Sequence, residues 1–132
     1  METFPVRTRR HTQFVDITRE LESAAADMGL RHGVLTVFVP HTTAGVTINE
    51  NADPSVTADM AAALDRAVPW QAGYTHSEGN AAAHLKASMM GSSVQVMVED
   101  GRLMLGTWQA VYLCEFDGPR TRDVWVTAAP GR

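Results

Sequence analysis

Residues 108–127 read WQAVYLCEFDGPRTRDVWVT, with runs of β-branched and aromatic residues on both sides of Asp117-Gly118-Pro119. Such runs favour β-strands, and the turn-forming residues between them favour a tight reversal of the chain. Two shorter runs before this stretch flank Asp100-Gly101, which is a strong signal for a two-residue hairpin. The last third of the chain is therefore predicted to hold strands at residues 94–99, 102–105, 108–116 and 122–127.

In two other segments apolar residues recur every three or four positions, which is the spacing of one helix face. Helices are therefore expected at residues 17–28 and 54–68, and the alanine-rich segment 81–90 is expected to form a third. Residues that favour helix ends flank these segments, namely Asp16 and Gly29, Asp53 and Pro69, and Asn80 and Gly91. Earlier strands are expected at residues 34–39 and 46–49 and within residues 4–14.

The resulting order of elements lacks the continuous strand–helix alternation that builds a doubly wound parallel sheet. An α+β domain with mainly antiparallel strands, packed as a β-sandwich, is the better interpretation. A single domain over residues 1–132 suits this length, which is too short for a (β/α)₈ barrel of roughly 250 residues. The last strands carry a large aromatic load, which suggests that some of it is buried between subunits; the residues are Trp108, Tyr112, Phe116 and Trp125.

The charge balance argues against nucleic acid as a partner. The chain has 11 Lys and Arg against 15 Asp and Glu, a formal charge of −4, whereas nucleic-acid binding depends mainly on neutralising phosphates. The single cysteine, Cys114, cannot form an internal disulfide and is expected to be a buried thiol. Neither a signal peptide nor an apolar run of about 20 residues is present, so we expect a cytoplasmic protein with no membrane partner.

Three histidines, His41, His76 and His84, are the candidate metal ligands. His41 follows an apolar strand, and the other two flank the start of the third predicted helix. Three imidazoles can hold a metal ion with one position left for water, and nitrogen ligands favour Zn²⁺ over Mg²⁺. The alternative is that these side chains cap the helix or make structural hydrogen bonds.

Two carboxylates, Glu50 and Glu78, are the candidate catalytic residues. Each lies in a polar loop, and each could act as a general acid or base or hold a water molecule on a metal. The alternative is that both are solvated loop charges.

Several hydroxyl, amide and basic side chains close to these residues are candidates for binding a phosphorylated substrate. The start of the third predicted helix and the guanidinium group of Arg120 suit phosphate oxygens. The alternative is that these residues only pack closely or face the solvent. The predicted substrate-binding residues are Thr42, Thr43, Asn51, Asn80, Lys86, Ser88 and Arg120.

Three ordered blocks of the sequence carry a family resemblance. The first is His41-Thr42-Thr43-Ala44-Gly45-Val46-Thr47-Ile48-Asn49-Glu50-Asn51. The second is Tyr74-x-His76-x-Glu78-Gly79-Asn80 followed by Ala83-His84-x-Lys86-x-Ser88. The third is Gly106-Thr107-Trp108-Gln109 followed by the run from Tyr112 to Arg120. On these blocks nearly the whole chain resembles the YjbQ family, also called UPF0047 and catalogued as the secondary thiamine-phosphate synthase enzyme family.

This resemblance implies a compact α+β fold with a β-sandwich, assembled as a homotrimer. It also implies a metal site at the positions of His41, His76 and His84. The implied side activity joins the thiamine pyrimidine pyrophosphate to the thiazole phosphate and releases pyrophosphate, and such a substrate could bring Mg²⁺.

Two other functions stay open at this point. The same three histidines could serve a metal-dependent hydrolase of another small substrate. Alternatively, the protein could be a noncatalytic trimer that binds a small ligand or a metal. The sequence does not decide between an enzyme and a binding protein.

Overall fold

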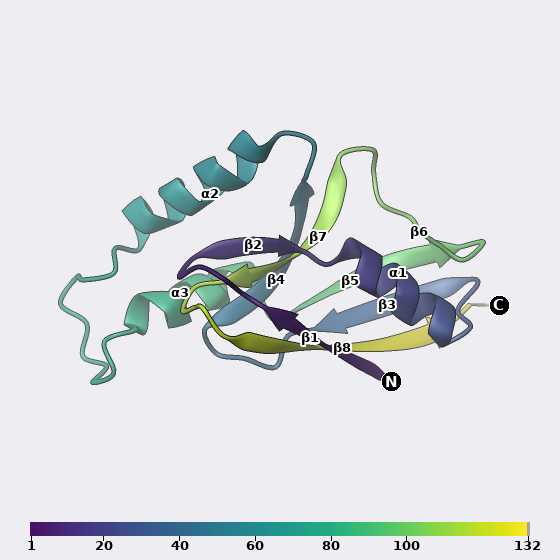
Figure 1. Cartoon of the computed structure of the whole chain (residues 1–132), viewed down its shortest axis with the longest axis horizontal. Coiled ribbons are helices and arrows are strands. Elements are labelled where there is room, and N and C mark those ends of the chain that lie inside the picture. The colour runs from purple at the N-terminus through teal and green to yellow at the C-terminus, as the bar shows by residue number, and fades with distance from the viewer. Residues whose placement is uncertain (132) are drawn as a thin grey trace.

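Two antiparallel sheets packed face to face form the body of the computed structural model, which describes residues 1–131 (Figure 1). The larger sheet has the strand order β1 (Glu2–Arg7), β8 (Thr121–Pro130), β3 (Gly33–Phe38), β5 (Ser93–Glu99) and β6 (Arg102–Leu103). The smaller sheet has the order β2 (Gln13–Asp16), β7 (Gln109–Glu115) and β4 (Ala44–Glu50). The helices are α1 (Thr18–Asp27), α2 (Pro54–Ala67) and α3 (Ala81–Met90). The predicted α+β sandwich with three helices is confirmed.

The main core lies between the two sheets, because alternate residues of each strand point inward. In β8 the buried residues are Arg122, Val124 and Val126, and between them the side chains are exposed. Val111 and Leu113 of β7 enter the same core from the smaller sheet, and α1 adds one apolar face to it. One charged residue, Arg122, therefore occupies a position that the alternation assigns to the interior.

The outer face of the smaller sheet carries a second apolar cluster, which α3 covers. Tyr112, Cys114 and Phe116 form this cluster together with alanines of α3. Burial raises the pKa of the Cys114 thiol to about 12, so the thiol stays protonated and is no nucleophile. Gly45 of β4 permits the close approach of α3, because a Cβ atom there would lie 2.7 Å from the carbonyl oxygen of Gly91.

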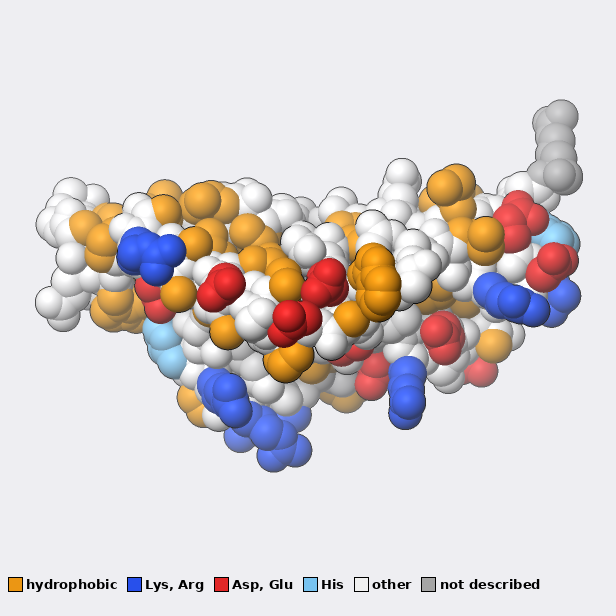
Figure 2. All heavy atoms as spheres, turned by 90° about the horizontal axis from the view of Figure 1, so that it is seen from above, with side chains coloured by type: hydrophobic (Ala, Val, Ile, Leu, Met, Phe, Trp, Pro, Cys, Tyr) orange, Lys and Arg blue, Asp and Glu red, His pale blue; other side chains and the backbone are white. Residues whose placement is uncertain are grey.

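Helix α2 stands apart from the sheets in Figure 1 and has no buried residue. The buried Lys86 of α3 reaches it and pairs with the carboxylate of Asp65. In Figure 2, which looks onto this side of the molecule, hydrophobic side chains lie among acidic ones at the surface. No helix within residues 1–131 is long and apolar enough to cross a membrane.

The strand expected within residues 4–14 is in fact two strands, β1 and β2, in different sheets. The chain crosses between the sheets after Thr8, whose N–H donates to the carbonyl of Arg120 at 2.9 Å. The first helix also begins later than expected, with Ile17 at its N-cap, while the Asp16 carboxylate accepts the N–H of Thr18 at 2.9 Å. Tertiary pairing with the β7–β8 turn therefore decides where β1 ends.

The hairpin predicted at Asp100-Gly101 is confirmed, since β5 pairs with β6 across it. Both turn residues have positive φ, 51° and 73°, as the favoured two-residue hairpin turn requires.

We expect the substitution Gly45→Ala to destabilise the fold by roughly 1–3 kcal/mol, because the new methyl group meets the backbone of the α3 end. Urea unfolding of the purified protein measures this. Gly106→Ala is the matched control, because a Cβ there meets only the flexible side chain of Gln109. Equal stability of the two variants would contradict the close packing of α3 on β4.

Candidate functional site

A polar cavity of about 470 Å³ lies where three connecting segments meet. These segments are the turn after β3, the connection between α2 and α3, and the turn between β7 and β8. The cavity is lined by Thr42, Thr43, Trp70, His76, Glu78, Asn80, His84, Asp117 and Arg120. All of these except Trp70 and Asp117 were predicted from the sequence, so the fold brings three separate sequence blocks to one place.

The β7–β8 turn contributes an ion pair to the cavity wall. Arg120 Nη2 lies 3.1 Å from Asp117 Oδ2, and Arg120 Nε donates to the Asp117 carbonyl at 2.9 Å. Asn80 Nδ2 also donates to Asp117 Oδ2, at 2.9 Å. A guanidinium group has five N–H donors, so Arg120, which is half exposed, keeps donors for a ligand while its direction is fixed.

His76 and His84 form a pair at the junction of two cavities. Their ring centroids lie 5.1 Å apart, with the rings nearly perpendicular, and Glu78 Oε2 lies 3.9 Å from His76 Nε2. Beyond this pair a second, largely apolar cavity of about 470 Å³ is lined mainly by Tyr74, Leu85 and small residues. The phenol of Tyr74 donates to the carbonyl of Pro69 at 2.6 Å, which holds its ring in place.

Helix α3 begins beside the polar cavity. Its N-cap residue, Asn80, makes no side-chain capping hydrogen bond, so the first turn of the helix lacks that acceptor. The N-terminus of a helix favours anions. The polar cavity therefore combines this end, one guanidinium group and two imidazoles.

The predicted three-histidine metal site is wrong for the single chain. His41 Nε2 accepts the backbone N–H of Asp123 at 2.9 Å, so its lone pair is not directed at the His76–His84 pair. Among residues 1–131, no three His, Cys, Asp or Glu side chains converge as ligands of one metal ion. Two imidazoles alone do not complete a structural or catalytic zinc site.

His41 and Ser88 instead lie with His84 on a third cavity, of about 440 Å³. Lys86 does not reach any of these cavities, because its ammonium group is buried against Asp65. Ser88 thus lies close to the predicted site, and Lys86 holds α2 against α3.

Glu50 and Asn51 lie at the other end of β4, about 20 Å along the strand from Ala44. The phenol of Tyr112 donates to the Glu50 carbonyl at 3.0 Å, and the N–H of Asn51 donates to the Trp108 carbonyl at 2.9 Å. Burial, with the charges of Asp16 and Glu50, raises the pKa of Tyr112. The single chain therefore does not bring Glu50 to the histidine pair.

A buried ion pair supports the polar cavity from beneath. Arg122 Nε lies 2.9 Å and 3.1 Å from the two carboxylate oxygens of Glu115, and Arg122 Nη2 pairs with the same carboxylate. Burial alone would raise the pKa of Glu115, but hydrogen bonds from Arg122, Thr8 and the Asp117 N–H lower it overall. Glu115 is therefore charged at neutral pH.

Sequence reasoning missed Glu115, Arg122 and Asp117. A signal for Arg122 was present, because it is in phase with the buried Val124 and Val126 of its strand. Asp117 was assigned to the turn alone, although it lies only three residues before the predicted Arg120. A charged residue that alternates with the same phase as buried apolar residues, close to a turn, would have indicated Arg122 and its neighbours.

Comparison with known proteins identifies close relatives over the whole described fold. The family model for UPF0047 protein YjbQ-like matches residues 2–131. UPF0047 protein YugU of Bacillus subtilis is 49% identical over 127 residues, which cover 96% of each chain. UPF0047 protein MJ1081 of Methanocaldococcus jannaschii is 44% identical and covers 93% of this chain and 89% of that protein.

Solved structures are also similar to this chain over nearly its whole length. A YjbQ/UPF0047 family protein of Clostridium acetobutylicum has 50% identity and a TM-score of 0.95, covering 98% of this chain and 100% of that one. A conserved hypothetical protein of Thermus thermophilus has 42% identity and a TM-score of 0.92, with the same coverage. The first is described as uncharacterized and the second as hypothetical, so neither brings an assigned function.

We expect the imidazole of His41 to titrate below pH 6.5, because burial and then the nearby Arg122 charge lower its pKa. As the pH falls, the imidazole of His41 binds a proton in the unfolded chain before it does so in the folded chain. The contribution of neutral His41 to the free energy of unfolding is therefore complete above pH 6.5, and it is lost as the pH falls through the lower pKa of the folded state. NMR titration of the histidine side chains measures the midpoint, with His41→Gln used for assignment. A midpoint at or above pH 6.5 would contradict the partly buried, neutral state of His41.

Proposed function

The chain belongs to the UPF0047 family of YjbQ-like proteins, and on that premise we propose that its polar cavity binds and converts a small phosphorylated ligand. The observation that carries this proposal is the convergence of Arg120, the His76–His84 pair and the start of α3 on one cavity. Each of these groups favours negatively charged oxygen atoms. Asp117 and Glu78 also line the cavity, and Asp117 is paired with Arg120 and Asn80. An anion would therefore be held mainly by the remaining N–H donors of Arg120 and by the start of α3.

The adjoining apolar cavity supports a ligand with two chemically different ends. It shares His76 and His84 with the polar cavity, and Tyr74 and Leu85 offer apolar surface. A small ring or alkyl group would occupy this side while its phosphate faces Arg120. The bond between the two ends would then lie beside the histidine pair.

Release of pyrophosphate is the chemistry that these groups serve best. Cationic and N–H groups stabilise the charge that develops on the leaving oxygen atoms. His84 or His76 can give a proton to the departing group. Glu78 Oε2, 3.9 Å from His76 Nε2, lies beyond hydrogen-bond distance of that ring. Glu50 has no role in this proposal within one chain, because it lies at the far end of β4.

Thiamine-phosphate synthesis is the named candidate reaction. In it the thiazole nitrogen forms a bond to the pyrimidine methylene carbon while the carbon–oxygen bond to pyrophosphate breaks. The pyrimidine suits the apolar cavity and the pyrophosphate suits the polar one. The predicted divalent metal, Zn²⁺ or Mg²⁺, stays a prediction, and no step of this proposal passes through it.

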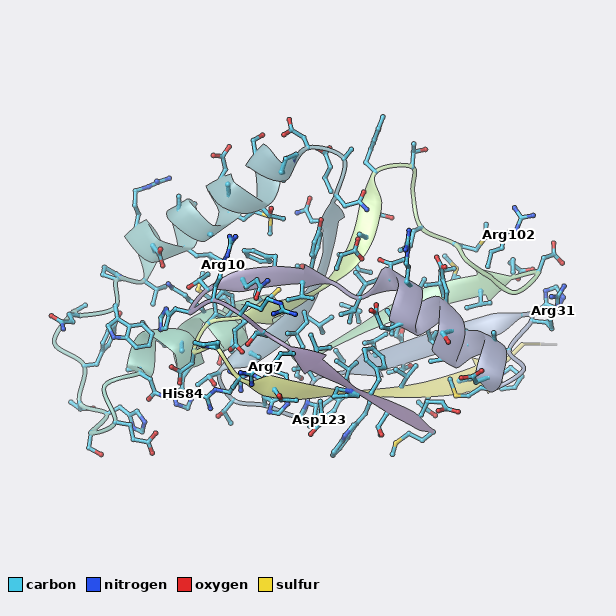
Figure 3. All side chains as sticks on the ribbon, viewed as in Figure 1. Arg7, Arg10, Arg31, His84, Arg102 and Asp123 are labelled. Carbon is cyan, nitrogen blue, oxygen red and sulfur yellow. The ribbon has the colours of Figure 1, made fainter. Side chains whose placement is uncertain are left out.

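We expect Arg120→Gln and His84→Ala each to weaken pyrophosphate binding by about tenfold or more, because each removes a group that interacts with the anion. Isothermal titration calorimetry with pyrophosphate measures the affinity. Arg102→Gln is the matched control, because Arg102 is exposed and lies at the opposite end of the molecule from His84 (Figure 3). We also expect the wild-type protein to form thiamine phosphate from the two precursors faster than His84→Ala.

Other outcomes would replace parts of the proposal. Pyrophosphate binding without turnover of any precursor would indicate a noncatalytic binding protein. Near-stoichiometric zinc by elemental mass spectrometry, together with hydrolysis of simple phosphate esters, would indicate a metal-dependent hydrolase. No binding of pyrophosphate to the wild-type protein would contradict the phosphate site itself.

The proposal includes self-association as a homotrimer. Helix α2 has no buried residue, and Leu85, Met89 and Trp108 are exposed although they are large and apolar. Helices gain most of their stability from tertiary packing. A second copy of the chain that packs against α2 would therefore stabilise this helix. The family resemblance sets the expected number of copies at three.

Sedimentation velocity at micromolar concentration tests this assembly. We expect a species of three times the chain mass of 14.4 kDa. A strict monomer at the same concentration would contradict self-association, and a dimer would contradict the expected number of copies.

A further inference from the structure

A buried group of three residues, none of which lines the polar cavity, holds three of the cavity residues, Thr43, Asp117 and Arg120. Glu115 and Thr8 are 0% exposed and Arg122 is 3% exposed. Arg122 lines a neighbouring cavity that shares Thr43 and Arg120 with the polar cavity. We name Thr8, Glu115 and Arg122 the buried triad.

Each member of the buried triad holds a cavity residue. Arg122 Nη2 donates to Thr43 Oγ1 at 2.8 Å and to the Thr43 carbonyl at 3.2 Å. Glu115 Oε2 accepts the backbone N–H of Asp117 at 3.1 Å. The buried triad therefore fixes one wall of the cavity from two sides.

Thr8 holds Arg120, which has the largest role in the proposed function. Its hydroxyl oxygen accepts the N–H of Arg120 at 2.9 Å, and its own N–H donates to the Arg120 carbonyl at 2.9 Å. The same hydroxyl lies 2.8 Å from Glu115 Oε1. Arg120 is thus held at its backbone by Thr8 and at its side chain by Asp117.

The β7–β8 turn packs closely against the buried triad at Gly118. A Cβ atom on Gly118 would lie 2.2 Å from the Arg10 carbonyl oxygen and 3.0 Å from Thr8 Oγ1. The turn is therefore pressed directly against the buried triad. Loss of the Thr8 hydroxyl would leave the N–H of Arg120 without an acceptor.

From this geometry we infer that the buried triad consists of positioning residues that set the direction of the Arg120 guanidinium group toward the ligand phosphate. The inference rests on the proposed phosphate site and names how that site is held ready. Preorganised donors cost no rearrangement when the charged ligand arrives. Thr8, on the connection after β1, is the member least involved in joining the two sheets.

The experiment compares Thr8→Val with Thr8→Ser, because valine keeps the volume and removes the hydroxyl, whereas serine keeps the hydroxyl. We expect Thr8→Val to raise the dissociation constant for pyrophosphate at least about tenfold, and Thr8→Ser to restore affinity to within about twofold. Calorimetry on folded protein measures both. Equal affinity of the two variants would overturn the inference.

A double-mutant cycle separates positioning from a general loss of stability. If Thr8 acts through Arg120, adding Thr8→Val to Arg120→Gln should not weaken pyrophosphate binding further. An additive loss would overturn the inference. Should Thr8→Val fail to fold, Thr8→Ala in the same cycle tests the same coupling, because alanine removes the hydroxyl, fits the same space and leaves the Glu115–Arg122 pair intact.

A further measurement does not depend on the ligand. The Nε–H signal of Arg120 in NMR spectra should shift in Thr8→Val and stay in place in Thr8→Ser. If wild-type protein fails to bind pyrophosphate, the proposed function fails, and this signal alone decides the inference. An Arg120 signal unchanged in Thr8→Val would overturn it.

Discussion

The ion pair between Glu115 and Arg122 is the interaction on which the site depends. Glu115 is the last residue of β7 in the smaller sheet, and Arg122 lies near the start of β8 in the larger one, so the pair joins the two sheets at one end of the sandwich. Burying two charges costs several kcal/mol of hydration free energy per ion unless other hydrogen bonds satisfy them. Here Thr8, Thr43 and the Asp117 N–H supply those bonds.

This arrangement explains why the polar cavity lies where it does. The connections at this end of the sandwich contain polar residues that cannot be buried in the apolar core, and the pair fixes two of these connections relative to each other. Helix α3, packed on β4 through Gly45, brings its N-terminus to the same end. Ligand-binding residues on loops are thus held by a rigid framework, as is common in binding sites.

Much of the fold could be predicted because local signals agree with the tertiary structure. Asp53 caps α2 as its sequence position suggests, and Asp100-Gly101 forms the expected hairpin. The site residues Thr43, His76 and Arg120 were also predictable, because polar residues at the ends of apolar segments tend to gather at one end of the sheets.

Other features depend on contacts that no local pattern reveals. The lone pair of His41 is taken by the backbone of Asp123, 82 positions away in the sequence, so the histidine set alone suggested a metal site that the chain does not form. Glu50 shares a sequence block with His41, yet the extended strand between them carries it to the far end.

The position of β8 has a consequence for how the protein forms during synthesis. This strand follows all the other strands described within residues 1–131, yet it lies between β1 and β3 in the larger sheet. Until the ribosome has released β8, β1 has no partner strand and the inner face of β3 and β5 is incomplete. Folding dominated by such distant pairing is slow. The emerging chain must therefore keep an unpaired strand edge from aggregating until its C-terminal strand arrives.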